Sequence, residues 1–151
     1  MLNAAIPTVK QLYFKQELLS DEKTMEYNKA FGGCIDFPKY KWKSWHKRWI
    51  NQPDRFYAYL YNRNEGFVGE IAYHLDEENH YLADIIVHSN YRGKGYGMEG
   101  LQLLCSIAKS SNVDVLYDNI AIDNPSVKLF LKLGFVEKYR TKDYIVVAKK
   151  L

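Results

Sequence analysis

Three glycines and two cationic side chains occur within six consecutive residues, Arg92-Gly93-Lys94-Gly95-Tyr96-Gly97. Because glycine has no Cβ, successive backbone N–H groups in such a segment can turn toward one point. A helix that begins there adds the partial positive charge of its N-terminus, and Arg92 and Lys94 add two formal charges. The segment therefore predicts a site for an anion such as a phosphate group, rather than a simple glycine-rich turn.

The same residues also match a second phosphate-binding pattern. Gly95-Tyr96-Gly97-Met98-Glu99-Gly100 has the G-x-G-x-x-G spacing of dinucleotide-binding sites, and Asp118 follows about 20 residues later. A dinucleotide fold, however, repeats βαβ units and carries its glycines in the first unit, whereas these glycines lie past the middle of the chain. No Gly-Lys-Ser or Gly-Lys-Thr follows at the spacing of a P-loop. Both nucleotide-binding patterns are therefore disfavoured.

Two carboxylates are candidates for the acid–base chemistry of such a site. Asp84 interrupts the apolar run 82–87 and shares a strand face with Leu82 and Ile86, where burial would raise its pKa toward neutrality. Glu70, on the preceding predicted strand, is the second candidate and would act through a water molecule. The alternatives are structural: an ion pair or a solvent-facing position for Asp84, and an exposed strand face for Glu70.

Other side chains that carry chemistry lack the necessary neighbours. Cys105 falls on the apolar face of a predicted helix and Cys34 has no histidine near it in sequence, which disfavours a covalent cysteine mechanism. The four histidines show no metal-ligand spacing with cysteines or carboxylates, so no metal site is expected. Trp42, Trp45 and Trp49 recur at i, i+3 and i+7, which predicts one helix face that packs into the core or, as the alternative, forms a wall of the substrate cleft.

Hydrophobic periodicity predicts the elements that position these residues. Residues 81–88 are typical of a strand buried on both faces, and the glycine segment follows directly as the start of a helix. Residues 113–122 return as a strand and complete one βαβ crossover. The other predicted strands are 11–18, 55–62, 67–75, 135–140 and 143–149; the other helices are 20–32, the tryptophan segment and 125–133. This order predicts a mixed sheet covered by helices on both faces.

Length and composition limit the class of protein. The 151 residues are 47% apolar and 26% charged, which fits one compact domain spanning 1–151. No apolar stretch approaches the ~18 residues of a membrane-spanning helix, and no secretion signal is recognisable, so we expect a cytoplasmic protein without a membrane partner. A net charge of +3 is too small to indicate a nucleic-acid partner.

Two segments resemble the GNAT family of N-acetyltransferases. The family signature, Arg/Gln-x-x-Gly-x-Gly/Ala after the fourth strand, is matched by Arg92, Gly95 and Gly97. The stretch from Asn124 to Phe135 resembles the second family block, which ends in Gly-Phe after a short helix. Together with the order of elements, the resemblance covers nearly the whole chain.

The resemblance implies an α/β fold with a mixed, mostly antiparallel sheet of about seven strands and helices on both faces. It implies acetyl-CoA as donor, with the pyrophosphate on residues 93–97 and the pantetheine in a wedge between the strands ending at His88 and Ile122. A backbone N–H near Val87 or His88 would polarise the acetyl carbonyl. The contacts expected with the coenzyme are Ile86, Val87, His88, Arg92, Gly93, Lys94, Gly95, Tyr96, Gly97, Asp123, Asn124 and Phe130.

The sequence departs from the family pattern at two places. The common asparagine of the family falls on Asp123, with Asn124 one residue later, so either side chain is a candidate for the coenzyme contact. Phe130 stands where many members have a tyrosine that protonates the leaving thiolate. Water, another tyrosine or unassisted departure must replace it, and a thiol pKa of ~8.5 makes the thiolate a tolerable leaving group.

The resemblance implies direct transfer of an acetyl group from acetyl-CoA to an amine, with Asp84 or Glu70 as the base. The acceptor is a small-molecule amine, a peptide N-terminus or a lysine, and the sequence does not distinguish among them. A homodimer is equally compatible with the sequence. The alternative is a non-catalytic module that binds CoA or a related nucleotide and reports its level.

Overall fold

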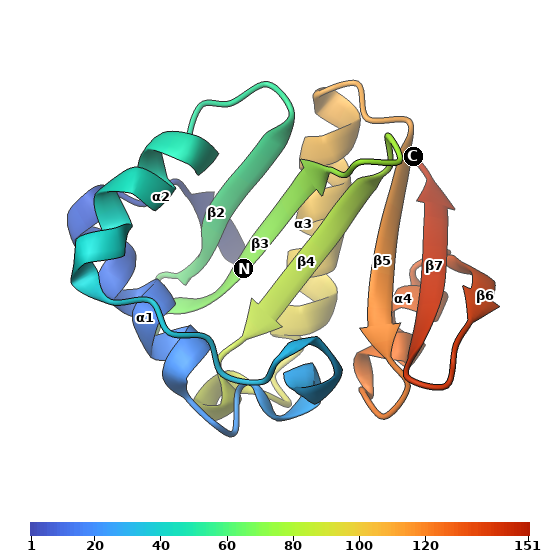
Figure 1. Ribbon diagram of the computed structural model, residues 1–151, viewed down its shortest axis with the longest axis horizontal. Coiled ribbons are helices and arrows are strands. Elements are labelled where there is room, and N and C mark those ends of the chain that lie inside the picture. Colours follow the sequence, from blue (N-terminus) through green and yellow to red (C-terminus); the bar gives the residue numbers. More distant parts are fainter.

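The computed structural model describes residues 1–151 and contains one seven-stranded sheet. The strand order is β1-β2-β3-β4-β5-β7-β6, and every neighbouring pair is antiparallel except β4 and β5 (Figure 1). The predicted mixed, mostly antiparallel sheet with helices on both faces is confirmed. No helix in the structure is both long and apolar enough to span a bilayer.

The strands are β1 (Leu2–Ala5), β2 (Arg55–Asn62), β3 (Gly66–Leu75), β4 (Tyr81–Val87), β5 (Val115–Ala121), β6 (Val136–Arg140) and β7 (Tyr144–Lys150). The α-helices are α1 (Tyr13–Ser20), α2 (Trp42–Trp49), α3 (Tyr96–Ser110) and α4 (Ser126–Lys132). Four short 3-10 helices complete the list: η1 (Val9–Leu12), η2 (Glu26–Phe31), η3 (Lys39–Lys41) and η4 (Ser89–Tyr91).

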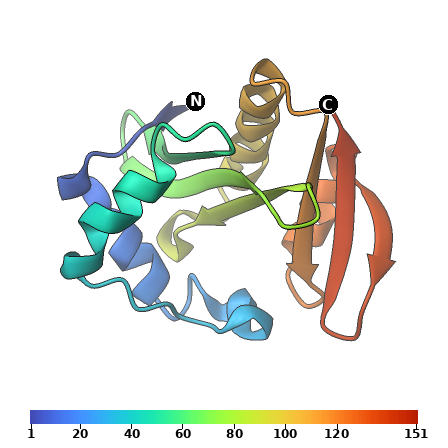
Figure 2. The same ribbon diagram turned by 45° about the horizontal axis from the view of Figure 1, so that its top comes forward.

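The parallel strands β4 and β5 pair over only part of their length. Their register consists of Tyr81 opposite Leu116 and Leu82 opposite Tyr117. Beyond these pairs the two strands separate, and Figures 1 and 2 show the gap widening toward their C-terminal ends. The rest of β4 therefore has a backbone edge that β5 does not use, since β3 pairs with its other side.

Helices α3 and α4 cover one face of the sheet. Leu101 and Leu104 of α3 are fully buried against Leu60 and Ile71 of the hairpin β2–β3. Gly100 permits the close approach, because a Cβ there would lie 2.7 Å from Leu60 Cδ1. This packing holds the N-terminus of α3 beside the end of β4.

Helices α1 and α2 cover the opposite face, with a second core of aromatic side chains. Trp42 and Trp45 are buried there, which confirms the core position predicted for the tryptophan face. Tyr57 and Tyr59 of β2 project into the same core and are almost fully buried. The sheet is therefore covered on both faces at β2 and β3.

Two predictions for the N-terminal region are wrong. Residues 11–18 form the end of η1 and most of α1 rather than a strand, because Phe14 and Leu18 recur at helical spacing toward the core. The first strand is the short edge strand β1, which pairs with β2. The helix predicted over 20–32 is reduced to η2, although its stop at the left-handed Gly32 is confirmed.

Candidate active site

A cavity of about 570 Å³ opens where β4 and β5 separate. Its walls come from the C-terminal halves of both strands, the glycine loop, the start of α4 and the segment that contains η2. The cavity therefore connects the predicted anion site to the predicted carboxylate Asp84.

The glycine loop has the backbone conformation that an anion site requires. Gly93 and Gly95 are left-handed, with φ of +79° and +83°, and α3 begins immediately afterwards at Tyr96. No atom lies within 4 Å of the place where a Cβ would stand at either glycine. Gly97 packs closely on α4, since its Cβ would lie 3.2 Å from Leu129 Cδ2. The first amides of α3 thus border open space along the cavity, which fits a diphosphate.

The two cations of the loop are bound to carboxylates outside the glycine segment. Arg92 lines the cavity but forms an ion pair of 2.8 Å with Glu26, the first residue of η2. Lys94 is paired with Glu65 in the β2–β3 turn, and it does not line the cavity. Tyr96 lines the cavity and donates its hydroxyl proton to Glu65.

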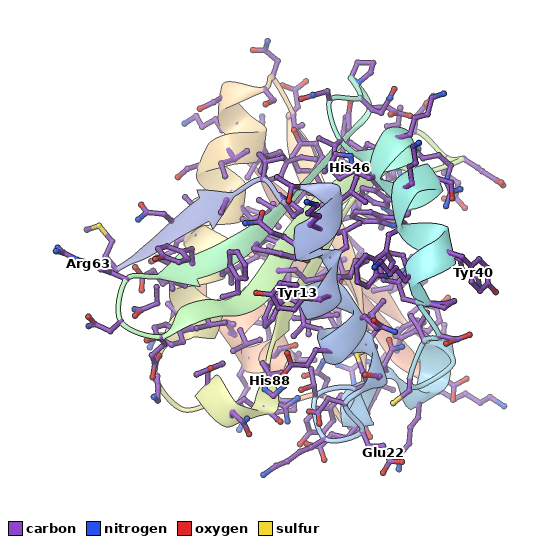
Figure 3. All side chains as sticks on the ribbon, turned by 90° about the vertical axis from the view of Figure 1, so that its left-hand side faces the viewer. Tyr13, Glu22, Tyr40, His46, Arg63 and His88 are labelled. Atoms are coloured by element: carbon purple, nitrogen blue, oxygen red, sulfur yellow. The ribbon has the colours of Figure 1, made fainter.

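The coenzyme residues expected on β4 divide into two groups. Ile86 and Val87 line the cavity. The side chain of His88 turns to the α1 side, where its Nε2 lies 3.5 Å from a carboxylate oxygen of Glu17 (Figure 3). The His88 N–H donates to the carbonyl of Val68 at 2.9 Å, so this amide is not free to polarise an acetyl carbonyl.

Two aspartates face the cavity from the diverging strands. Burial raises the pKa of Asp84 from its ordinary value of 3.8 to about 6, with a further increase from the charge of Glu70 and a decrease from Lys15. Burial, followed by the charge of Asp84, raises the pKa of Asp118 well above its usual range. The Asp84 side chain is accessible to water because it borders the cavity. A carboxylate that borders the cavity with its pKa raised in this way can accept a proton from a bound amine.

Glu70 has a different environment from the one predicted. Its side chain is 2% exposed, so the expected exposed strand face is wrong. Its Oε1 lies 3.1 Å from Lys15 Nζ and accepts a 2.6 Å hydrogen bond from the hydroxyl of Tyr57. The Lys15 ammonium also lies over the ring of Trp45, 4.9 Å from its centroid. Glu70 does not line the cavity, and this arrangement favours a buried structural ion pair.

The residues of the second family block also separate in space. Asn124 lines the cavity, and its side-chain oxygen accepts a 2.9 Å hydrogen bond from the N–H of Ser126 at the start of α4. Asp123 is exposed and does not line the cavity. Phe130 lines the cavity with its ring almost fully buried against Phe135, so no phenol stands at this position.

Several cavity residues were not identified as site residues from the sequence. Asp118 was noted only for its distance from the glycines, although it breaks the apolar strand β5 as Asp84 breaks β4. That interruption is a signal that could have identified it. The η2 side chains that line the cavity, Tyr27, Asn28 and Phe31, form no motif, so no sequence signal marks them.

Both cysteines lie outside the cavity, whereas the imidazole of His74 lines it. Neither Cys34, which is exposed, nor Cys105, which is buried in the α3 core, lines it. No three histidine, cysteine or carboxylate side chains are grouped so that they could hold a metal ion. The cavity therefore combines an anion site with two carboxylates and one imidazole, that of His74, whose pKa is lowered by burial.

Comparison with known proteins identifies the family. Residues 16–135 match the family model of the acetyltransferase (GNAT) family. No curated protein matches the sequence at a significant level.

Solved structures share the whole fold at low sequence identity. YncA from Salmonella typhimurium, solved with its cofactor acetyl-CoA, has a TM-score of 0.81 and 15% identity over 99% of this chain and 94% of that chain. Spermidine N-acetyltransferase from Vibrio cholerae, solved with CoA and spermine, has a TM-score of 0.78 and 18% identity over 99% and 94%. A GNAT acetyltransferase from Streptococcus pneumoniae has a TM-score of 0.81 and 16% identity over both full chains.

The family model spans most of the chain, from α1 to the residue after α4 that completes the Gly-Phe block. Within that span lie the separated strands β4 and β5 and the glycine loop that begins α3. This chain therefore belongs to the acetyltransferase (GNAT) family of enzymes.

Proposed function

We propose that this protein transfers an acetyl group from acetyl-CoA to an amine by direct attack in a ternary complex. The observation that carries the proposal is a single cavity that borders both the glycine loop and the carboxylates of Asp84 and Asp118. An anion site for the donor and a base for the acceptor are thus available in one space.

The donor would be held mainly by backbone groups. The amides of residues 93–97 would bind the pyrophosphate, because the left-handed glycines leave room on the cavity side. The edge of β4 at Ile86 and Val87 would pair with the amides of the pantetheine, as an added strand does. When bound, acetyl-CoA supplies an acyl group activated as a thioester.

The acceptor would be oriented and deprotonated by the acidic side of the cavity. An amine that arrives protonated is attracted by the ionised carboxylate of Asp84, since the nearby cations Lys15 and Arg92 are already paired with Glu70 and Glu26. Asp118, which holds its proton more tightly, would accept or donate a hydrogen bond beside it. Asp84 would then accept the proton that the nitrogen must lose before it can attack. The C–N bond forms as the C–S bond breaks, and the nitrogen loses its second proton as it becomes an amide. That proton would pass through water to the departing thiolate, because Phe130 has no hydroxyl to donate.

The alternative function is a sensor that binds CoA without catalysis. The observation in its favour is Phe130, because the family tyrosine is absent at this position. A sensor would bind the coenzyme in the same cavity but would release no thiol.

We further propose that residues 1–151 act as one domain in the cytoplasm. Both cores pack on the same sheet, and the two cysteines are free thiols, as is usual in a reducing compartment.

The test is a thiol-release assay with acetyl-CoA and a panel of amines: a polyamine, an amino acid, an aminoglycoside and peptides with a free N-terminus or lysine. We expect thiol release with at least one acceptor, with an activity that depends on Asp84. Tight CoA binding without thiol release from any acceptor would replace the enzyme by the sensor.

A further inference from the structure

We propose that Arg92 is a positioning residue for the acceptor. Its side chain holds η2 at the cavity and thereby connects the part of the cavity that would bind the amine to the glycine loop that would bind the coenzyme. The proposal rests on the proposed function, since it assigns to η2 a part in binding the amine. It differs from the expectation from sequence, which places the Arg92 side chain on the phosphate.

The contacts of Arg92 are directed to the η2 segment. The terminal nitrogen Nη1 donates to a carboxylate oxygen of Glu26 at 2.8 Å, and Nη2 donates to the carbonyl of Thr24 at 2.8 Å. The guanidinium also lies over the ring of Tyr27, 5.7 Å from its centroid. One side chain thus binds three residues of a segment more than 60 positions away in the sequence.

A second set of hydrogen bonds joins the same two segments. The N–H of Ser89 donates to Thr24 Oγ1 at 2.9 Å, and Ser89 Oγ donates to Asp21 Oδ2 at 2.9 Å. Asp21 Oδ2 also accepts from the N–H of Thr24 at 3.0 Å. These bonds anchor the beginning of the segment, whereas Arg92 reaches the residues that enter η2.

The apolar core holds η2 only at its start, where the preceding residue Met25 is buried. None of its six residues is buried, and Figure 2 shows it as the light-blue turn beside the gap between β4 and β5. At the far side of the gap η2 contacts β5, and Phe31 packs on Tyr144 of β7 with ring centroids 6.0 Å apart. Because none of the residues of η2 is buried, its position depends strongly on the polar contacts of Arg92.

The position of η2 determines the shape of the acceptor side. Tyr27, Asn28 and Phe31 line the cavity, which Asp84 and Asp118 also line. Gly93, the first glycine of the loop, follows Arg92 directly. An anion that orders this loop therefore also restrains Arg92, and through it η2. The coupling is reciprocal, so an acceptor that orders η2 also favours coenzyme binding.

Three variants and one control separate this role from phosphate binding. Glu26→Gln removes the ion pair without touching the cavity, because Glu26 does not line it. Arg92→Ala removes all the contacts of Arg92 with Glu26, Thr24 and Tyr27, and the double variant of Glu26 and Arg92 tests whether the two residues act together. Arg140→Ala is the control, since it removes an exposed ion pair with Glu137 on β6.

The first readout does not require activity. Amide hydrogen exchange reports on Asn28, Gly32 and Gly33, whose N–H groups are hydrogen-bonded within this segment. We expect CoA to slow their exchange in the parent protein, and we expect faster exchange in Glu26→Gln and Arg92→Ala but not in Arg140→Ala. The second readout is the KM for each substrate. We expect the acceptor KM to rise about fivefold to tenfold in both single variants, with the KM for acetyl-CoA within about twofold.

In the Glu26→Gln background, Arg92→Ala should change the acceptor KM by less than about twofold. The proposal is overturned if Arg92→Ala weakens CoA binding while Glu26→Gln leaves the exchange of 24–33 and the acceptor KM unchanged; Arg92 is then an anion ligand. Faster exchange without a change in the acceptor KM overturns it as well. If no amine supports thiol release, the proposed function fails, and the exchange data with CoA still decide whether Arg92 joins the loop to η2.

Discussion

The charge of the cavity that an amine would enter is determined by three ion pairs between side chains. Lys15 is bound to Glu70, Lys94 to Glu65 and Arg92 to Glu26, which leaves Asp84 and Asp118 without a cationic partner. The cavity is therefore acidic beside its anion-binding loop, although the chain as a whole carries a net charge of +3. Local pairing, rather than net charge, determines what this site attracts.

Replacement of Gly95 tests the anion site. In Gly95→Val, a β-branched residue must adopt the left-handed φ of +83° at the N-cap of α3, or the loop must rearrange. We expect the Kd for CoA, measured by calorimetry, to rise at least about tenfold, the equivalent of ~1.4 kcal/mol. Gly66→Val is the control, because Gly66 has a similar φ of +81° in the β2–β3 turn outside the cavity. Equal CoA affinity in the folded Gly95→Val protein would exclude the loop as the phosphate site.

Replacement of Asp84 tests the base. With a pKa of about 6, Asp84 is mostly ionised at neutral pH, so the rate of the parent enzyme should fall as pH decreases through that value. In Asp84→Asn we expect kcat to fall roughly 10²–10⁴-fold, the acidic limb to disappear and the rate to recover at high pH. CoA affinity should be nearly unchanged. A folded variant that keeps both kcat and the acidic limb would mean that Asp84 is structural.

At the scale of elements, the separation of β4 from β5 creates the cavity, and α1 contributes to its electrostatics. Glu70 lies opposite Ile86 and Ala72 lies opposite Asp84 in the β3–β4 register, so Glu70 and Asp84 are neighbours on one face. Lys15 reaches this face from α1 and neutralises Glu70. The helix thus limits how far the pKa of Asp84 rises.

Removal of Lys15 should destabilise the packing of α1 on the sheet. In Lys15→Met the buried carboxylate of Glu70 loses its only cationic partner, which costs about 3 to 5 kcal/mol when a buried pair is broken from one side. Urea denaturation measures the loss. The double variant Lys15→Met/Glu70→Gln should recover most of it, because no charge is then left buried. A single variant within about 1 kcal/mol of the parent would show that the pair contributes little.

At the scale of the whole molecule, the acidic cavity should make stability depend on pH. The folded pKa of Asp84 is raised from 3.8 to about 6, so the folded state holds this proton more tightly than the unfolded chain. The stabilisation of the folded state by this proton is complete below pH ~4 and is lost as pH rises through about 6. In Asp84→Asn the side chain does not ionise, so its stability does not show this loss.

Thermal unfolding at two pH values checks this expectation. At each pH the measured quantity is the Tm of Asp84→Asn minus the Tm of the parent. This difference should be larger at pH 8 than at pH 4 by about 2 to 4 °C, the shift that ~1 kcal/mol produces in a domain of this size. This figure is well below the full value of the pKa change, because water reaches the side chain through the cavity. An equal difference at both pH values would show that Asp84 ionisation does not oppose folding.

Local patterns were sufficient for most of the architecture. The tryptophan spacing predicts α2, the turn after Asn62 predicts the β2–β3 hairpin, and the glycines predict the start of α3, because each signal depends on neighbours in sequence. The failure at 11–18 has a different cause. A short apolar segment is ambiguous in period, and its helical form depends on Tyr57 and Tyr59, which lie more than 40 residues away.

The sequence by itself determined the elements from α2 onward and the glycine loop, and it singled out Asp84 as a candidate base. Only the tertiary structure decided the directions of the charged side chains: Arg92 toward Glu26, Lys94 toward Glu65, and Glu70 into the core with Lys15. It also brought Asp118 into the same cavity as Asp84. The physical reason is that ion pairs and hydrogen bonds join residues that are 29 to 66 positions apart here, and no periodicity or spacing encodes such contacts.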